Sequence, residues 1–171
     1  MVRAEDLYRH LDDLRTDTYE GLGPRSERVE LYRGAVTLLG PVVRRVLEEA
    51  DAAFLAGTGQ ISEHGPSEDG RGGLTASWEL SWPEQQSATP VRGERDRVGP
   101  VQVIAWFAAG FTHPHLAGAS LGHWPLQVTD ETDAERQEPI VRAIVEAELH
   151  QRVFEGSWKI LPGYPDRSAA H

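Results

Sequence analysis

The fold is decided by the stretch Leu74-Thr75-Ala76-Ser77-Trp78-Glu79-Leu80-Ser81-Trp82. Apolar side chains alternate with polar ones along all of it, and a period of two predicts a β-strand with one buried face. Pro83 follows and ends the strand, because proline has no N–H to offer a sheet. We therefore expect Trp78, Leu80 and Trp82 to lie in the core, packed against a helix from earlier in the chain.

Two helices are predicted upstream of this strand. Residues 3–17 carry leucines at spacings of four and three, which indicates a short amphipathic helix. A second helix is predicted from Ser26, a suitable N-cap, to about Ala53. Gly40 and Pro41 predict a kink in it, or a break into two helices. Its apolar stripe is expected to form the core beside Trp78 and consists of Val29, Tyr32, Val36, Leu39, Val43, Val46 and Ala50.

Four further segments have the composition of strands. Residues 101–109 are apolar on both faces and should lie centrally in the sheet. The other three are shorter or less regular, and they are residues 54–62, 124–128 and 158–161.

The remaining segments are predicted as loops and one helix. Residues 64–73 are rich in turn-forming side chains, and residues 84–99 are polar and charged, so we expect a turn and a mobile loop there. A long helix should begin at Thr132 or Asp133 and end near Glu155, with Pro139 in or near its first turn. A C-terminal tail follows at 162–171.

These elements predict an α+β fold. Its sheet is expected to be a small antiparallel meander of roughly three to five strands, covered by the N-terminal helices and by one long C-terminal helix. The chain of 171 residues is long enough for a single domain, 1–171, with its own core.

The composition narrows the class of protein. The chain has no cysteine, which excludes disulfides, thiolate metal ligands and a cysteine nucleophile. Its net charge of −10 argues against binding to nucleic acid or to an anionic membrane. Neither a signal-peptide core nor an apolar run of ~20 residues is present, so we expect a cytoplasmic protein. Five arginines close in sequence are expected to form a solvated helix face: Arg25, Arg28, Arg33, Arg44 and Arg45.

The side chains best suited to bind a metal or a ligand lie in residues 111–125, directly after the central apolar strand. His113 and His115 are two residues apart, so on extended backbone both imidazoles point to the same side. His123 follows across a turn that contains Gly118. Neutral imidazole is a ligand of zinc, iron, copper and nickel, and three protein ligands leave one position open for water or substrate. The segment therefore predicts a site for a divalent transition metal.

The predicted C-terminal helix offers further ligands. Glu146 and His150 stand at positions i and i+4, so they share one helix face. Three histidines, or two histidines with Glu146, would let a bound metal activate water or polarise a substrate oxygen. The first hypothesis is thus a small metal-dependent enzyme that acts on a small molecule.

A second hypothesis uses the same histidines structurally. Pro114 also suits a rigid loop whose imidazoles bond to the backbone. Ser120 beside His123 only weakly resembles the nucleophile turn of a serine hydrolase, because the chain lacks the alternating strand–helix pattern of that fold. The other histidines considered, His10, His64 and His171, are expected at the surface or in the tail.

A local resemblance favours the second hypothesis. The stretch His113-Pro114-His115-Leu116, followed by Gly118-Ala119-Ser120-Leu121-Gly122, resembles the segment after the sheet in bacterial relatives of E2 ubiquitin-conjugating enzymes. There a His-Pro-His or His-Pro-Asn turn precedes a Cys-Leu-Gly or Cys-Leu-Asp element. In this register Ser120 takes the place of the catalytic cysteine. The resemblance covers about ten residues and implies a protein-interaction domain without thioester chemistry. Substrate, partner and oligomeric state stay open.

Overall fold

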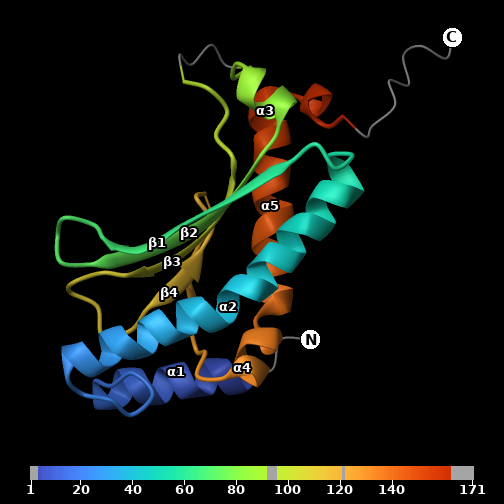
Figure 1. Cartoon of the computed structure of the whole chain (residues 1–171). Helices are drawn as coiled ribbons and strands as arrows, with labels where there is room; N and C mark the ends of the chain where they lie inside the picture. The colour runs from blue at the N-terminus through green and yellow to red at the C-terminus, as the bar shows by residue number, and fades with distance from the viewer. Residues whose placement is uncertain (1–3, 92–95, 121, 163–171) are drawn as a thin grey trace, which may run out of the picture.

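A computed structural model describes residues 4–91, 96–120 and 122–162 of the chain. It has the predicted α+β architecture, a five-stranded antiparallel sheet with helices packed on one face (Figure 1). In chain order the elements are α1 (Ala4–Thr16), α2 (Arg25–Phe54), β1 (Gln60–Glu68), β2 (Leu74–Ser81), α3 (Pro83–Ser87), β3 (Val101–Phe107), β4 (His115–Ala117), β5 (Trp124–Pro125), α4 (Glu131–Arg136), α5 (Glu138–Gly156) and the 3₁₀ helix η1 (Trp158–Ile160).

The sheet is a meander in which each strand pairs with the next along the chain, in the order β1-β2-β3-β4-β5. β3 therefore lies at its centre, as its apolar composition predicted. In β2 every second side chain is buried, and Trp78 stands opposite Val103 of β3. The alternation predicted for this strand is confirmed.

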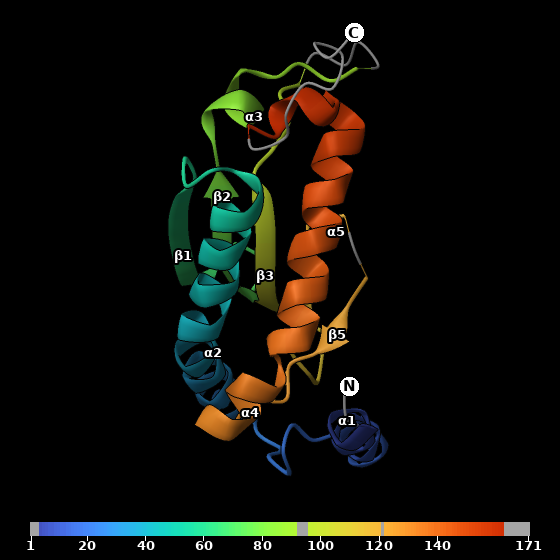
Figure 2. The same ribbon diagram turned by 90° about the vertical axis from the view of Figure 1, so that its right-hand side faces the viewer.

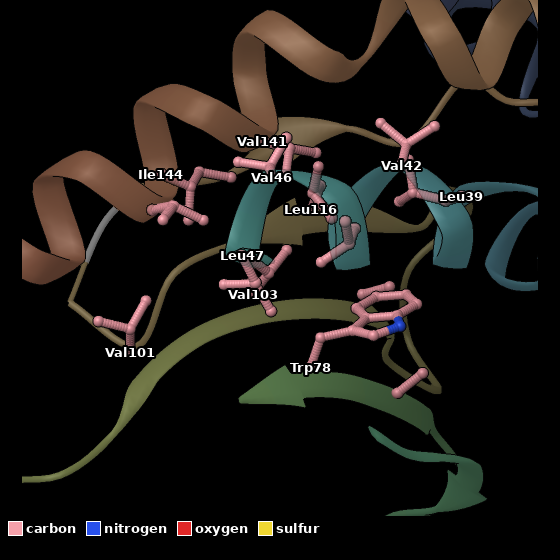
Figure 3. Packing of buried hydrophobic residues seen from close by; sticks show 14 of the residues in the cluster. Leu39, Val42, Val46, Leu47, Trp78, Val101, Val103, Leu116, Val141 and Ile144 are labelled. Atoms are coloured by element: carbon pink, nitrogen blue, oxygen red, sulfur yellow. The ribbon is translucent and has the colours of Figure 1, made fainter. Parts of the chain in front are cut away.

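The core lies between the sheet and the helices α2 and α5, which run side by side over one face (Figure 2). Trp78 is 3% exposed and packs among aliphatic side chains of α2 and β3 (Figure 3). Val141 and Ile144 bring α5 to the same cluster. The expected stripe of α2 is buried from Tyr32 onward, so the helix periodicity located the core correctly.

Three features of the helices differ from the prediction. α2 runs without a break through Gly40 and Pro41, because Leu39 and Val42 on either side are both buried and their packing outweighs the lost backbone hydrogen bond. Its N-cap is Pro24 rather than Ser26. The single C-terminal helix is divided at Gln137 into α4 and α5.

Several predicted strands also differ from the structure. Phe54 ends α2, and β1 begins only at Gln60 and extends to Glu68, so the turn predicted at 64–73 is limited to residues 69–73. Of residues 158–161, the first three form η1 instead of a strand, since Ser157 accepts a hydrogen bond from the N–H of Lys159 and starts a helical turn. The strand expected at 124–128 is limited to the two residues of β5.

The segment 84–99, predicted as a mobile loop, contains α3 at its start. Gln85 is buried, and its side chain donates a hydrogen bond to the backbone of Val98 at 2.5 Å. The middle of that segment, 92–95, and most of the predicted tail, 163–171, lie outside the described residues. Within the described part of the chain, no helix has the length and hydropathy to cross a bilayer.

The orientation of α1 is the largest departure from expectation. Its leucine stripe, which we define as Leu7, Leu11 and Leu14, is 40%, 52% and 53% exposed. The buried face carries Asp6, His10 and Asp13 instead. Polar contacts hold this face against α4 and the residue that follows it. Arg9 donates two hydrogen bonds to Asp133, at 3.1 and 3.2 Å, and Gln137 donates one to Asp6 at 3.1 Å.

Candidate functional site

We call residues 111–125 the histidine segment. Two arginines at the start of α2 hold it in place. The Arg25 guanidinium donates to the backbone oxygens of Phe107 and Phe111, at 3.2 Å each, and stacks 3.6 Å above the Phe107 ring. Arg28 is buried and donates to the backbone oxygen of Thr112 at 3.3 Å. The expectation that these arginines form a solvated face is therefore wrong for Arg28, whose guanidinium also donates to the backbone oxygens of Leu22 and Asp17, at 3.0 and 2.6 Å.

His113 is a buried structural residue. Its Nδ1 lies 3.1 Å from the backbone oxygen of Pro114, and its Nε2 lies 3.2 Å from a carboxylate oxygen of Asp13. Both ring nitrogens therefore face protein oxygens, which leaves neither of them for a metal ion. Burial lowers the pKa of His113, although the Pro114 carbonyl and Asp13 act in the opposite direction.

Asp13 connects α1 to the histidine segment. Besides His113 it accepts hydrogen bonds from the N–H groups of Glu20 and Gly21, at 2.9 and 3.2 Å, and from the Thr18 hydroxyl at 2.8 Å. Burial acts to raise the pKa of Asp13, but these donors together hold it below its usual range. The carboxylate is thus charged and fully engaged at neutral pH.

Three more histidines continue from His113 towards the surface in a row. The His10 ring centroid lies 4.4 Å from that of His113 and 5.8 Å from that of His115, and His115 lies 5.8 Å from exposed His123. We call His10, His113, His115 and His123 the histidine row. His10 was expected at the surface, but the polar face of α1 carries it inward.

Two members of the row have free nitrogens. The Nδ1 atoms of His10 and His115 are buried without a hydrogen-bond partner among the described residues. Burial, together with the neighbouring His113, lowers the pKa of His10 to about 4. Burial and the flanking rings of His10 and His123 lower the pKa of His115 to about 4 as well, although its contact with the His113 backbone opposes this. Both rings are therefore neutral at pH 7 and able to act as ligands.

Aromatic side chains border the row on the face of the sheet that α2 and α5 leave uncovered. The Trp106 ring lies 5.6 Å from that of His115, 4.9 Å from that of His123 and 5.2 Å from that of Phe111. Phe111 is 49% exposed. An apolar surface therefore surrounds the outer end of the histidine row.

The two helix residues proposed as ligands lie elsewhere. Glu146 and His150 are exposed on α5 and line a pocket with Phe54 and Trp158, far from the ring contacts of the row. Within the described residues, no group of three or more histidine, aspartate or glutamate side chains is arranged to hold a metal ion. The structure thus brings His113, His115 and His123 together but not Glu146 and His150.

A different acidic residue of α5, Glu148, contacts the histidine segment. Glu148 is fully buried and accepts hydrogen bonds from the N–H and hydroxyl of Ser120, at 2.9 and 2.6 Å, and from Arg152 at 2.9 Å. Gly118 allows this approach, because a Cβ there would lie 2.6 Å from the Glu148 carboxylate. Glu148 and His10 have no local sequence signal that marks them, since their partners are 28 and 100 or more residues away in the chain.

The comparisons with known proteins leave the chain without an assigned family. A scan against protein-family models, a search of curated proteins and a search of solved structures each found no match to it.

Proposed function

We propose that this chain is a protein-interaction domain that uses α1 as its contact surface. One observation carries the proposal: α1 faces the domain with its polar side and presents its leucine stripe to solvent. A helix at the surface of a globular protein normally buries its apolar stripe. The reversed orientation leaves the stripe available to another chain, and Tyr8 beside it, 68% exposed, widens the surface.

The stripe has the spacing of a helix–helix seam. Leu7, Leu11 and Leu14 follow one another at intervals of four and three residues, as in the apolar seam of paired helices. The polar contacts to Asp133 and Gln137 hold α1 as a fixed platform. The occupant we propose is therefore an amphipathic helix of a partner protein.

The E2-like resemblance supports a binding role. The chain has helices before an antiparallel meander, an order compatible with that family, and its His-Pro-His stretch connects β3 to β4 within the meander. Under this reading Ser120 stands at the cysteine position, and its hydroxyl donates to Glu148 at 2.6 Å. A hydroxyl committed to a buried carboxylate suits an anchor for the loop, and the domain would act by binding in the cytoplasm.

A photo-crosslinking experiment tests the proposal. The crosslinking amino acid p-benzoylphenylalanine is placed at position 8 or, in a second protein, at position 30 as a control on exposed α2. We expect position 8 to yield one defined product in extracts of the source cells, and Leu11→Asp to remove it. Because Leu11 is half exposed, this substitution should leave the thermal midpoint of the domain nearly unchanged.

Three outcomes contradict the proposal. Position 8 and position 30 could give the same products, Leu11→Asp could leave the product unaffected, or the purified protein alone could crosslink to itself. The last result, checked by analytical ultracentrifugation, would identify the occupant as a second copy of this chain instead of a partner protein.

The metal-dependent enzyme is the second candidate function, and one observation favours it. The Nδ1 atoms of His10 and His115 are buried and have no hydrogen-bond partner among the described residues, and neutral rings such as these are the form that binds zinc, iron, copper or nickel. With His123 they could supply three ligands, whereas His113 is already engaged by Asp13. Bound metal would activate a water molecule or polarise a substrate oxygen.

Elemental analysis of purified protein distinguishes the two candidates. Stoichiometric metal in the wild type, lost in His115→Ala and kept in His64→Ala, would support the enzyme. Protein that carries no metal after growth with each of the four metals would leave the interaction domain as the function.

A further inference from the structure

A separate pocket lies where the end of α2 meets α5 and η1, at the opposite end of the molecule from α1 (Figure 1). Its volume is about 360 Å³, which is in the range of small-molecule sites. Phe54 of α2 and Trp158 of η1 line it, together with Glu146, Leu149 and His150 of α5. The Glu146–His150 pair predicted as metal ligands is thus placed in an apolar pocket.

The pocket presents two aromatic rings to solvent. Phe54 is 36% exposed and Trp158 is 44% exposed. Among the described residues neither ring stacks on another aromatic side chain. Both side chains are therefore partly accessible to a ligand, and among aromatic side chains the electron-rich face of tryptophan attracts cations most strongly.

Glu146 adds a carboxylate without a counter-ion. Within the described part of the chain it makes no hydrogen bond and no ion pair. Arg142, one helical turn earlier, is engaged by Glu49 at 2.7 Å and by Glu138 at 2.8 Å. Arg142, between α2 and α5, is thus already paired with other carboxylates. Among the described residues, Glu146 beside Phe54 has no charged partner.

We propose that this pocket binds a small organic cation of the alkylated ammonium class. The ring faces of Phe54 and Trp158 contact its methyl groups, and the Glu146 carboxylate neutralises its charge. Leu149 forms the apolar floor, and His150 flanks the carboxylate on the same helix face. This site and its ligand are independent of the leucine stripe and of the proposed interaction with a partner.

Nuclear magnetic resonance with two matched probes tests the proposal. The probes are choline and its neutral isostere 3,3-dimethylbutan-1-ol, which have the same shape and differ in charge. Choline should shift the indole N–H signal of Trp158 saturably, and the alcohol should bind at least tenfold more weakly. The signal is assigned by its absence in Trp158→Phe.

Variants connect binding to the named residues. Glu146→Gln should weaken choline binding at least tenfold, while Glu131→Gln, an exposed control on α4, should leave it unchanged. Equal binding of the two probes, or unchanged binding to Glu146→Gln, would overturn the proposal.

Discussion

At the scale of single residues, the adjacent Asp12 and Asp13 of α1 have different surroundings. Among the described residues the exposed Asp12 side chain pairs only with Arg15, whereas the buried Asp13 carboxylate accepts four hydrogen bonds. Replacing Asp13 with alanine would leave buried donors of Glu20, Gly21 and His113 without an acceptor. This carboxylate therefore joins α1 to His113 of the histidine row.

We expect Asp13→Ala to lower the free energy of unfolding by about 2–4 kcal/mol, because several buried polar groups lose their partner together. The neighbouring Asp12→Ala should change it by less than about 0.5 kcal/mol, since exposed ion pairs contribute little. Urea denaturation of both variants measures the difference. Equal effects would mean that the Asp13 contacts are solvated and not a structural anchor.

The histidine row predicts a pH dependence of stability. In the unfolded chain each imidazole binds a proton near pH 6.5, whereas the folded pKa values of His10 and His115 are about 4. Between these values the unfolded state binds more protons, so the free energy of unfolding should fall as the pH is lowered from about 6.5 to about 4. His115→Asn should reduce this slope by up to one proton per molecule, measured by urea denaturation at several pH values. An unchanged slope would show that the His115 ring titrates normally.

At the scale of elements, α2 keeps one unfavourable residue in its interior. Pro41 has no N–H for the carbonyl of Thr37 and costs helix stability. Pro41→Ala should therefore raise the free energy of unfolding by about 1–3 kcal/mol. The control is Gly34→Ala, on the exposed face of the same helix with open space around it. It measures the increase in the free energy of unfolding that comes from helix propensity alone. A gain for Pro41→Ala no larger than that of Gly34→Ala would indicate that the helix had already adjusted to the proline.

The contact between the histidine segment and α5 depends on Gly118. A Cβ at this position would lie 2.6 Å from an oxygen of Glu148 and 2.9 Å from its Cγ, and Glu148 is held by Ser120 and Arg152. Gly118→Ala should cost about 1–3 kcal/mol of stability, because the buried side chain cannot move away. Gly110→Ala, with nothing near its Cβ, serves as the control in thermal unfolding. Equal midpoints would mean that the loop shifts freely.

Periodicity identified α2 and β2 because both elements bury an apolar face against the sheet or the helices. The same signal in α1 indicated a helix correctly but not its orientation. That orientation depends on partners such as Asp133, more than a hundred residues away from Arg9 in the sequence. A stripe of leucines shows which face is apolar, and only the available polar partners decide whether that face turns inward.

The same limit applies to the candidate site. The structure brings His113, His115 and His123 together, but His113 lies in a bend before β4, so strand alternation does not set the direction of its ring. His10 joins them through the docking of α1, and Glu148 through the docking of α5. Glu146 and His150 share a helix face, but that face contacts η1 and α2. Sequence spacing thus predicts neighbours within an element, and packing decides neighbours between elements.

At the scale of the whole molecule, one core supports surfaces at both of its ends. α1, whose His10 contacts the other rings of the histidine row, lies at one end, and the C-terminal ends of α2 and α5, beside the pocket lined by Phe54 and Trp158, lie at the other (Figure 1). The core between them is centred on β2 and β3, with α2 and α5 covering a single face (Figure 2). Damage to this core should therefore affect both ends, whereas damage at one end should leave the other intact.

Trp78 is the residue that tests this division. It is 3% exposed and packs between the sheet and α2 (Figure 3), so Trp78→Ala removes a large buried side chain that its neighbours cannot replace. We expect a loss of about 3–5 kcal/mol in the free energy of unfolding, measured by urea denaturation. Trp158→Ala, at a position 44% exposed, should cost less than about 1 kcal/mol. A loss below about 1 kcal/mol for Trp78→Ala would place this face of β2 in solvent and shift the strand register by one residue.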